Sequence, residues 1–83
     1  MSLKSLRRYA SVEGLRATGW KIVIDHQRGL EDFGINGITT IYITDRYGKH
    51  AKGRAVCAKP DTFDRRRGVR IALGRALLAL YGR

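Results

Sequence analysis

The 83-residue chain carries 17 lysine and arginine residues against 7 aspartate and glutamate residues, and its formal net charge of +10 favours an anionic partner, most often a nucleic acid. The length allows one small domain spanning residues 1–83, a lone Cys57 excludes an internal disulfide framework, and two histidines are too few for a zinc-ligand cluster. No apolar run can span a bilayer, and residues 1–14 lack the apolar stretch of a secretory signal, so we expect a cytoplasmic protein with no membrane partner.

The first part of the chain predicts a short helix, a strand and a loop. Apolar residues recur at roughly helical spacing over residues 3–15, and Gly14 is expected to end this helix. The stretch "WKIVID", residues 20–25, alternates apolar and polar side chains, which is typical of a strand. Residues 26–37 contain three glycines and few β-formers, so we expect a loop there.

Two further strands and a hairpin turn follow. The stretch "ITTIYIT", residues 38–44, is rich in β-branched residues and predicts a strand. The letters "DRYG", with aspartate first and glycine last, suit a type I turn closed by a glycine bulge. In "HAKGRAVC", residues 50–57, Lys52 and Arg54 alternate with uniformly small residues, so another element can approach closely on the small side. The small set is Ala51, Gly53, Ala55 and Cys57.

A long helix is expected after Pro60, and Asp61 or Asp64 is positioned to cap it. An apolar stripe recurs at helical spacing through this helix. The stripe consists of Val69, Ala72, Leu73, Ala76, Leu77 and Leu80, widened by Ile71, Leu78 and Tyr81, with Arg66, Arg67, Arg70 and Gly74 toward the opposite side. These elements predict an α+β domain in which the long C-terminal helix packs on a three-stranded antiparallel sheet (β-β-β-α), with a short N-terminal helix in front.

The start of the long helix is the first candidate site, because Arg65, Arg66 and Arg67 stand there. A helix start carries partial positive charge from unpaired N–H groups, so a cation there is unfavourable by roughly 0.3–1 kcal/mol. A bound phosphate would be attracted by both the N–H groups and the guanidinium groups. We therefore expect these three arginines and Arg70 to contact phosphates. The alternative is a solvated charged surface with neighbouring aspartates as counter-ions.

The sheet face away from the long helix is the second candidate site. That face is expected to show one aromatic residue, Tyr42, beside the cations Lys52 and Arg54. Lys21 and Thr40 belong to the same face. An aromatic ring among cations and hydroxyls can stack on a base beside a phosphate track. The alternative is an ordinary solvated face of an antiparallel sheet.

The hairpin tip is the third candidate site, with Arg46 and Lys49 beside Tyr47 and His50. A projecting basic hairpin can touch a nucleic-acid backbone, and we expect Arg46 and Lys49 to make such contacts. The alternative is that polar residues at the turn serve solubility alone.

One cluster has catalytic potential: Asp25, His26, Glu31 and Asp32. Carboxylates near a histidine can hold magnesium and activate water, as a nuclease requires. The alternative is an acidic loop that offsets neighbouring arginines, and no recognisable metal motif supports the nuclease. We therefore expect no enzyme, no metal and no cofactor.

Two stretches resemble known proteins. The closing stretch "RRRGVRIALGRALLAL" is similar to the last segment of the double-stranded RNA-binding domain, with cations first and then alanines and leucines at helical spacing. This resemblance implies an α-β-β-β-α fold in which Arg65, Arg66, Arg67 and Arg70 contact phosphates. The three-stranded-sheet DNA readers of phage integrases are similar in the same way. The stretch "CAKPDTFDRRRGVRIALGRAL" resembles small proteins of bacteriophages and other mobile elements, which implies a short regulatory or inhibitory protein.

These patterns predict a nucleic-acid-binding protein that contacts the phosphate backbone of a duplex, DNA or RNA, through its basic helix start. The alternative is a small phage or mobile-element inhibitor, for example an anti-CRISPR, that binds a host protein or a protein–nucleic acid machine. The sequence leaves open the choice of DNA or RNA. A homodimer formed through the edge strands of so small a sheet is also open.

Overall fold

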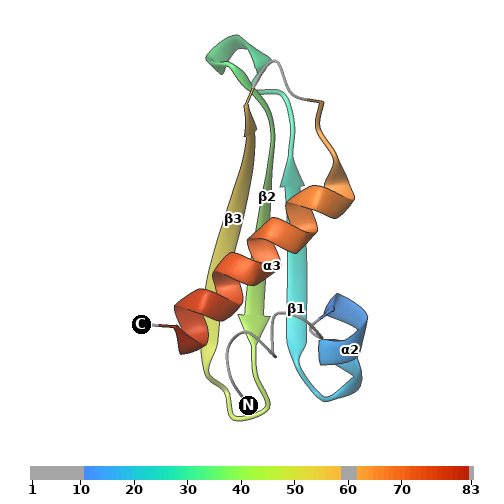
Figure 1. The fold of residues 1–83 in the computed structure, drawn as a ribbon, viewed down its shortest axis with the longest axis vertical. Coiled ribbons are helices and arrows are strands. Elements are labelled where there is room, and N and C mark those ends of the chain that lie inside the picture. The colour runs from blue at the N-terminus through green and yellow to red at the C-terminus, as the bar shows by residue number, and fades with distance from the viewer. Residues whose placement is uncertain (1–10, 59–61, 83) are drawn as a thin grey trace.

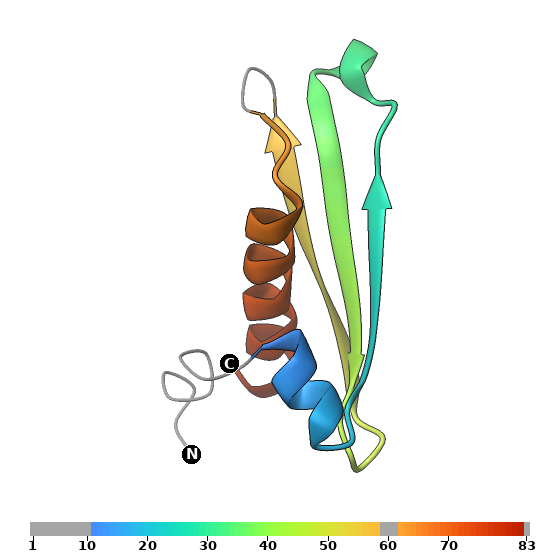
Figure 2. The same ribbon diagram turned by 90° about the vertical axis from the view of Figure 1, so that its right-hand side faces the viewer.

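The computed structural model describes residues 11–58 and 62–82. The elements, in chain order, are α2 (Val12–Ala17), β1 (Lys21–Gln27), the 3-10 helix η1 (Glu31–Phe33), β2 (Ile35–Thr44), β3 (His50–Ala58) and α3 (Arg65–Tyr81). The three strands form one antiparallel sheet in the order β1-β2-β3, and α3 crosses it diagonally (Figure 1). Both α-helices lie on the same side of the sheet (Figure 2). The predicted α+β architecture is confirmed.

The strand register explains which residues form the core. Ile41 and Ile43 of β2 stand opposite Ile24 and Ile22 of β1, and opposite Gly53 and Ala51 of β3. Because side chains alternate between the two faces of a strand, all of these positions share the face that the helices cover. Ile41 and Ile43 are fully buried there, so the centre of the sheet is also the centre of the core.

The small-residue face of β3 allows α3 to lie directly on the sheet. A Cβ atom at Gly53 would overlap the carbonyl oxygen of Ala72 and the backbone nitrogen of Ala76. Ala72 and Ala76 are themselves completely buried. The close approach that the sequence predicted from alternating small residues is therefore confirmed, and it is made backbone against backbone.

The turn between β2 and β3 is fixed by Asp45. The backbone N–H of Gly48 donates to the Asp45 carbonyl at 3.2 Å, and Gly48 has a φ of 86°, which favours glycine. The Asp45 carboxylate accepts from the backbone N–H of Tyr47 at 2.8 Å and of Lys49 at 2.9 Å. The predicted type I turn closed by glycine is confirmed. The buried Asp45 carboxylate stabilises it by accepting hydrogen bonds from two backbone N–H groups, one within the turn and one directly after it.

Asp64, one of the two predicted caps, starts α3. Its side chain accepts from the backbone N–H of Arg67 at 3.2 Å, whereas Asp61 lies outside the described residues. Asp64→Ala is expected to lower the free energy of unfolding by about 1 kcal/mol, because it leaves that N–H without its side-chain acceptor. Asp64→Asn keeps a side-chain acceptor and should lower the free energy of unfolding by only a few tenths of a kcal/mol. Urea unfolding of both variants checks this, and equal losses would contradict the capping role.

Several predicted details need correction. The predicted helix at residues 3–15 is α2, which spans Val12–Ala17, is capped by Ser11 and continues through Gly14; residues 3–10 lie outside the described part. The loop predicted at 26–37 is partly regular, because β1 continues to Gln27 and β2 begins at Ile35, which pairs with Ala58. Pairing with β3 extends β2 before the β-branched stretch at residues 38–44. The β-propensity of a segment does not reveal which strand it will pair with.

The predicted apolar stripe of α3 is confirmed in its centre and is narrower than expected. Ala72, Leu73, Ala76, Leu77 and Leu80 are buried. Leu78 and Tyr81, expected to widen the stripe, are 47% and 45% exposed. Successive helix residues point about 100° apart, so Leu78 turns away from the sheet although Leu77 faces it. Among residues 11–58 and 62–82, no helix combines the length and apolar character needed to cross a bilayer.

Candidate nucleic-acid interface

One face of the sheet carries no helix in the described part of the chain (Figure 2). Its most exposed apolar and aromatic residues are Val23, Tyr42 and Val56, with 60%, 47% and 51% of each residue accessible. An antiparallel sheet often keeps one face in water, but that face is then mostly polar. Here two valines of the edge strands and a tyrosine of the central strand lie uncovered among the polar side chains.

The register brings cations to this tyrosine from both neighbouring strands. Tyr42 stands opposite Val23 of β1 and Lys52 of β3. One row along, Arg54 stands opposite Thr40, and one row the other way, Lys21 stands opposite Thr44. Directly opposed side chains have Cβ atoms about 4.5–5.5 Å apart, and neighbouring rows are about 7 Å apart. We call Lys21, Tyr42, Lys52 and Arg54 together the sheet face.

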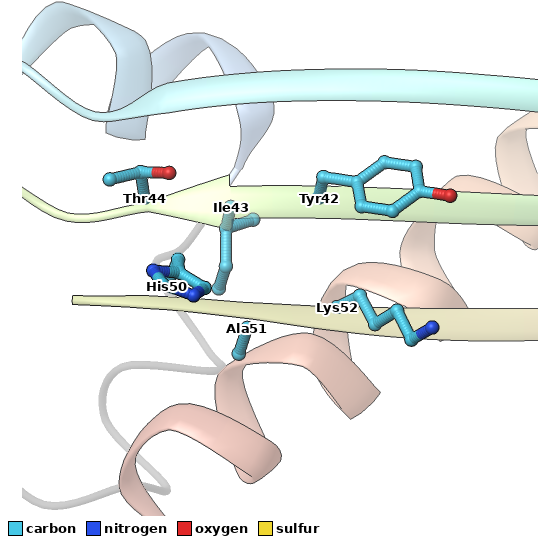
Figure 3. A pocket seen from close by; sticks show the side chains of 6 residues that line it. All are labelled: Tyr42, Ile43, Thr44, His50, Ala51 and Lys52. Carbon is cyan, nitrogen blue, oxygen red and sulfur yellow. The ribbon is translucent and has the colours of Figure 1, made fainter. Parts of the chain in front are cut away.

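A shallow hollow of about 390 Å³ lies beside the sheet face, at the hairpin end of β2 and β3 (Figure 3). It is lined by Tyr42, Ile43, Thr44, His50, Ala51 and Lys52. The side chains of Tyr42 and Lys52 extend side by side in the same direction from adjacent strands (Figure 3). The lining of the hollow is mostly apolar, so it offers apolar surface next to the Tyr42 ring and the Lys52 side chain.

The positive charge of the sheet face is not neutralised within the described part of the chain. Asp25 lies in the same row as Arg54, but Thr40 stands between them. No ion pair is formed by the three cations of the sheet face with any described carboxylate. Thr40 was expected to be shown on this face and is in fact buried, because it occupies the central strand between two larger side chains. The available anion-binding groups are therefore Lys21, Lys52 and Arg54.

The predicted helix-start site lies on the other side of the sheet. Arg65, Arg66, Arg67 and Arg70 are all exposed, on the layer that covers the core. The first three point about 100° apart in succession, so they do not converge on one point. The Asp64 carboxylate already accepts from the N–H of Arg67, so the chain supplies its own anion to the helix start.

The hairpin tip is tied to the end of α3. Arg46 Cζ lies 5.6 Å from the ring centroid of Tyr47, and Lys49 Nζ lies 5.9 Å from that of Tyr81. Trp20 packs on Tyr81 with ring centroids 6.2 Å apart. Partial burial raises the pKa of Tyr81 above its ordinary value, and the Asp45 carboxylate raises it further. The two predicted cations of the hairpin tip thus lie against aromatic rings. Local sequence patterns could not predict the cluster of Trp20, Lys49 and Tyr81, because these residues are far apart in the chain.

Two arginines have structural partners that sequence reasoning missed. β1 and β3 are the edge strands of the sheet. Arg16 donates to the carbonyl of Ile22 in β1 at 2.7 Å, and Arg75 donates to the carbonyl of Arg54 in β3 at 2.6 Å. Each edge strand therefore has one carbonyl occupied by an arginine from a helix. The sequence gives no signal for either hydrogen bond, because each joins a helix side chain to a strand carbonyl and neither residue belongs to a recognisable motif.

The residues weighed for a nuclease site are dispersed. Asp25 and His26 are neighbours in β1 and point to opposite faces. His26 Nδ1 lies 2.9 Å from Thr39 Oγ1, and its ring meets Phe63 edge-on with centroids 5.8 Å apart. Arg28 Cζ lies 4.9 Å from the same phenylalanine ring. Within residues 11–58 and 62–82, no three histidine, cysteine or acidic side chains are grouped so that they could hold a metal ion.

Comparison with known proteins adds no assignment: no family model, curated protein or solved structure matches this chain. The residues that can determine its function are therefore those of the sheet face, the helix start and the hairpin tip.

Proposed function

We propose that this protein binds duplex nucleic acid through phosphate contacts made by the sheet face. The observation that supports this most directly is the uncovered Tyr42 with Lys52 beside it, flanked by Lys21 and Arg54 in adjacent rows. These cations have no ion-pair partner among the described carboxylates, so their charge is available to phosphates. The proposal involves no catalysis, metal or cofactor, and it places the protein in the cytoplasm.

A duplex suits the sheet face better than a single strand does. Proteins that bind single strands usually stack successive bases on several aromatic side chains, each worth about 1–3 kcal/mol. The sheet face offers one phenol ring, and the side chains in its own and the two adjacent rows are Val23, threonines, the three cations, His50 and one carboxylate, Asp25. Most of the affinity must then come from phosphates, which a duplex presents at about twice the density of one strand.

Counter-ion release gives this proposal a quantitative form. Three cations that each neutralise one phosphate predict a slope of log K against log salt of about −2.7. Raising the salt from about 50 to 200 mM should then weaken binding about 40-fold. Because sequence is read by base contacts, an interface of this kind should bind unrelated duplex sequences with similar affinity.

The test compares two variants that lose the same charge from opposite sides of the sheet. One combines Lys21→Gln, Lys52→Gln and Arg54→Gln; the control combines Arg66→Gln, Arg67→Gln and Arg70→Gln. Fluorescence anisotropy with hairpin duplexes of DNA and of RNA, at two salt concentrations, measures the affinity. We expect the affinity of the sheet-face variant to fall at least about tenfold and that of the control to fall about threefold or less.

Two results would contradict the proposal. Equal losses in both variants would mean that net charge, rather than the sheet face, attracts the duplex. Wild-type protein that ignores every duplex at low salt would remove the function itself. Thermal unfolding of both variants belongs to the experiment, because all six substituted side chains are exposed and should leave the fold intact.

A second candidate function is inhibition of a host protein or protein–nucleic acid machine. It is favoured by apolar side chains that stay exposed, Val23 and Val56 on the sheet and Phe33 in η1, the last with 78% accessible. Exposed apolar side chains can contribute to a protein-binding surface. The same anisotropy titration separates the two functions, since an inhibitor that recognises a folded protein need not bind bare duplex.

A further inference from the structure

The exposed cations of this domain form two surfaces that face away from each other. The first is the sheet face. The second, which we call the helix face, consists of Arg66, Arg67 and Arg70 on the outside of α3. Residues three and four apart on a helix are neighbours, so Arg70 lies beside both of the others. α3 lies on the covered side of the sheet (Figure 2), whereas alternation along β2 places Tyr42 on the uncovered side, so the sheet lies between the exposed arginines of α3 and Tyr42.

The helix face is distinct from the N–H groups at the helix start. The Asp64 carboxylate already accepts from the N–H of Arg67 in the first turn, and the helix face consists of side-chain guanidinium groups rather than of backbone N–H groups. Within the described residues, none of the three arginines forms an ion pair, and each is exposed. At Gly74, one turn after Arg70, a Cβ atom would meet nothing within 4 Å, so the surface beside the arginines is open.

We propose that one chain holds two duplex segments at once, one on the sheet face and one on the helix face. This inference rests on the proposed function and adds a second polyanion to it. The chemistry that selects the second occupant is charge complementarity, because the helix face presents guanidinium groups and no described carboxylate pairs with them. Guanidinium groups bind phosphates with two parallel N–H bonds.

The thickness of the domain makes this arrangement electrostatically feasible. A helix with its side chains is about 10–12 Å across, and the sheet adds a further layer. Two duplexes on opposite sides are then separated by more than the Debye length of about 8–10 Å near physiological salt. The repulsion between the two duplexes is therefore largely screened. The cations of the face that binds each duplex also neutralise part of its charge.

Bridging by a single chain does not require a dimer. Pairing of edge strands is the usual route by which a small sheet dimerises. Here Arg16 and Arg75 each occupy a carbonyl of an edge strand, Ile22 in β1 and Arg54 in β3. An incoming strand would have to displace both the bond and the side chain, so the two surfaces are expected to act within one monomer.

The two surfaces should differ in strength. The sheet face combines three cations with an aromatic ring and a shallow hollow, whereas the helix face has three cations on a convex helix. The helix face should therefore bind more weakly and release its duplex first as salt rises.

A capture assay tests the proposal. One hairpin duplex is fixed to beads, a second carries a fluorophore in solution, and the full-length protein is titrated at low salt. We expect fluorescence on the beads to rise with protein and to fall again once each duplex carries its own chain. The helix-face variant, Arg66→Gln with Arg67→Gln and Arg70→Gln, should lose at least about tenfold of this capture while binding to the first duplex stays within about threefold.

The outcomes separate this proposal from the proposed function. Normal binding of the first duplex without capture of the second overturns bridging and leaves the proposed function standing. No binding of either duplex overturns both. Capture that survives in the helix-face variant, or a wild-type protein that sediments as a dimer and bridges only in that form, also overturns bridging by two faces of one chain.

Discussion

Gly53→Ala is expected to destabilise the domain by about 3 kcal/mol or more, although it adds a single methyl group. The added Cβ would overlap the Ala72 carbonyl oxygen and the Ala76 nitrogen. These are backbone atoms of a helix, so they cannot rotate aside as the end of a flexible side chain can. Relief requires α3 to move off the sheet, which would open the contact at the centre of the core.

Gly74→Ala provides a matched control with the opposite sign. Gly74 lies inside α3, and a Cβ there would meet nothing within 4 Å. Alanine is favoured over glycine in a helix by about 0.5–1 kcal/mol, so this variant should be more stable than the wild type. In thermal unfolding, Gly53→Ala should lower the Tm by roughly 12–24 °C and Gly74→Ala should raise it by a few degrees. A Gly53→Ala protein with a wild-type Tm would show that α3 does not lie directly on β3.

The β3–α3 contact shows what the sequence could predict about the fold. Small residues on one side of "HAKGRAVC" and small residues in the apolar stripe of α3 each suggested a close approach, and together they specified the contact. The turn was equally predictable, because Asp45 and Gly48 carry local chemistry. The start of β2 was not, because Ile35 belongs to a strand through its pairing with Ala58, and pairing is a property of the folded chain.

The candidate site was predictable as a set of residues more than as an arrangement. Alternation placed Tyr42, Lys52 and Arg54 on one face, and the register confirms that grouping. The run of three arginines suggested a single clamp, but helical rotation spreads these side chains around α3. The partners of Arg16 and Arg75 are carbonyls of edge strands, and no sequence motif identifies them. The charge total therefore suggested a polyanion partner but did not predict how the cations are distributed over the two sides of the sheet.

Leu77→Asp is expected to unfold the domain, whereas Leu78→Asp is expected to leave it folded. Leu77 is 1% exposed and belongs to the core cluster, while its neighbour Leu78 is 47% exposed. A carboxylate at residue 77 would be buried without a partner, at a cost of at least about 5 kcal/mol. That is comparable to the total stability of about 4–12 kcal/mol for a domain of this size. At residue 78 the loss should be about 1–2 kcal/mol, from helix propensity, partial burial and the helix dipole.

Circular dichroism and urea unfolding of the two variants measure this difference, and a cooperative transition in Leu77→Asp would contradict the burial of that side chain. The pair also separates fold from charge in nucleic-acid binding. Both variants carry one negative charge more than the wild type, so a long-range attraction set by net charge alone would weaken equally in each. If the sheet face binds the duplex, Leu78→Asp keeps most of its affinity and Leu77→Asp loses it, because only the folded sheet brings Lys21, Lys52 and Arg54 together around Tyr42 on one face.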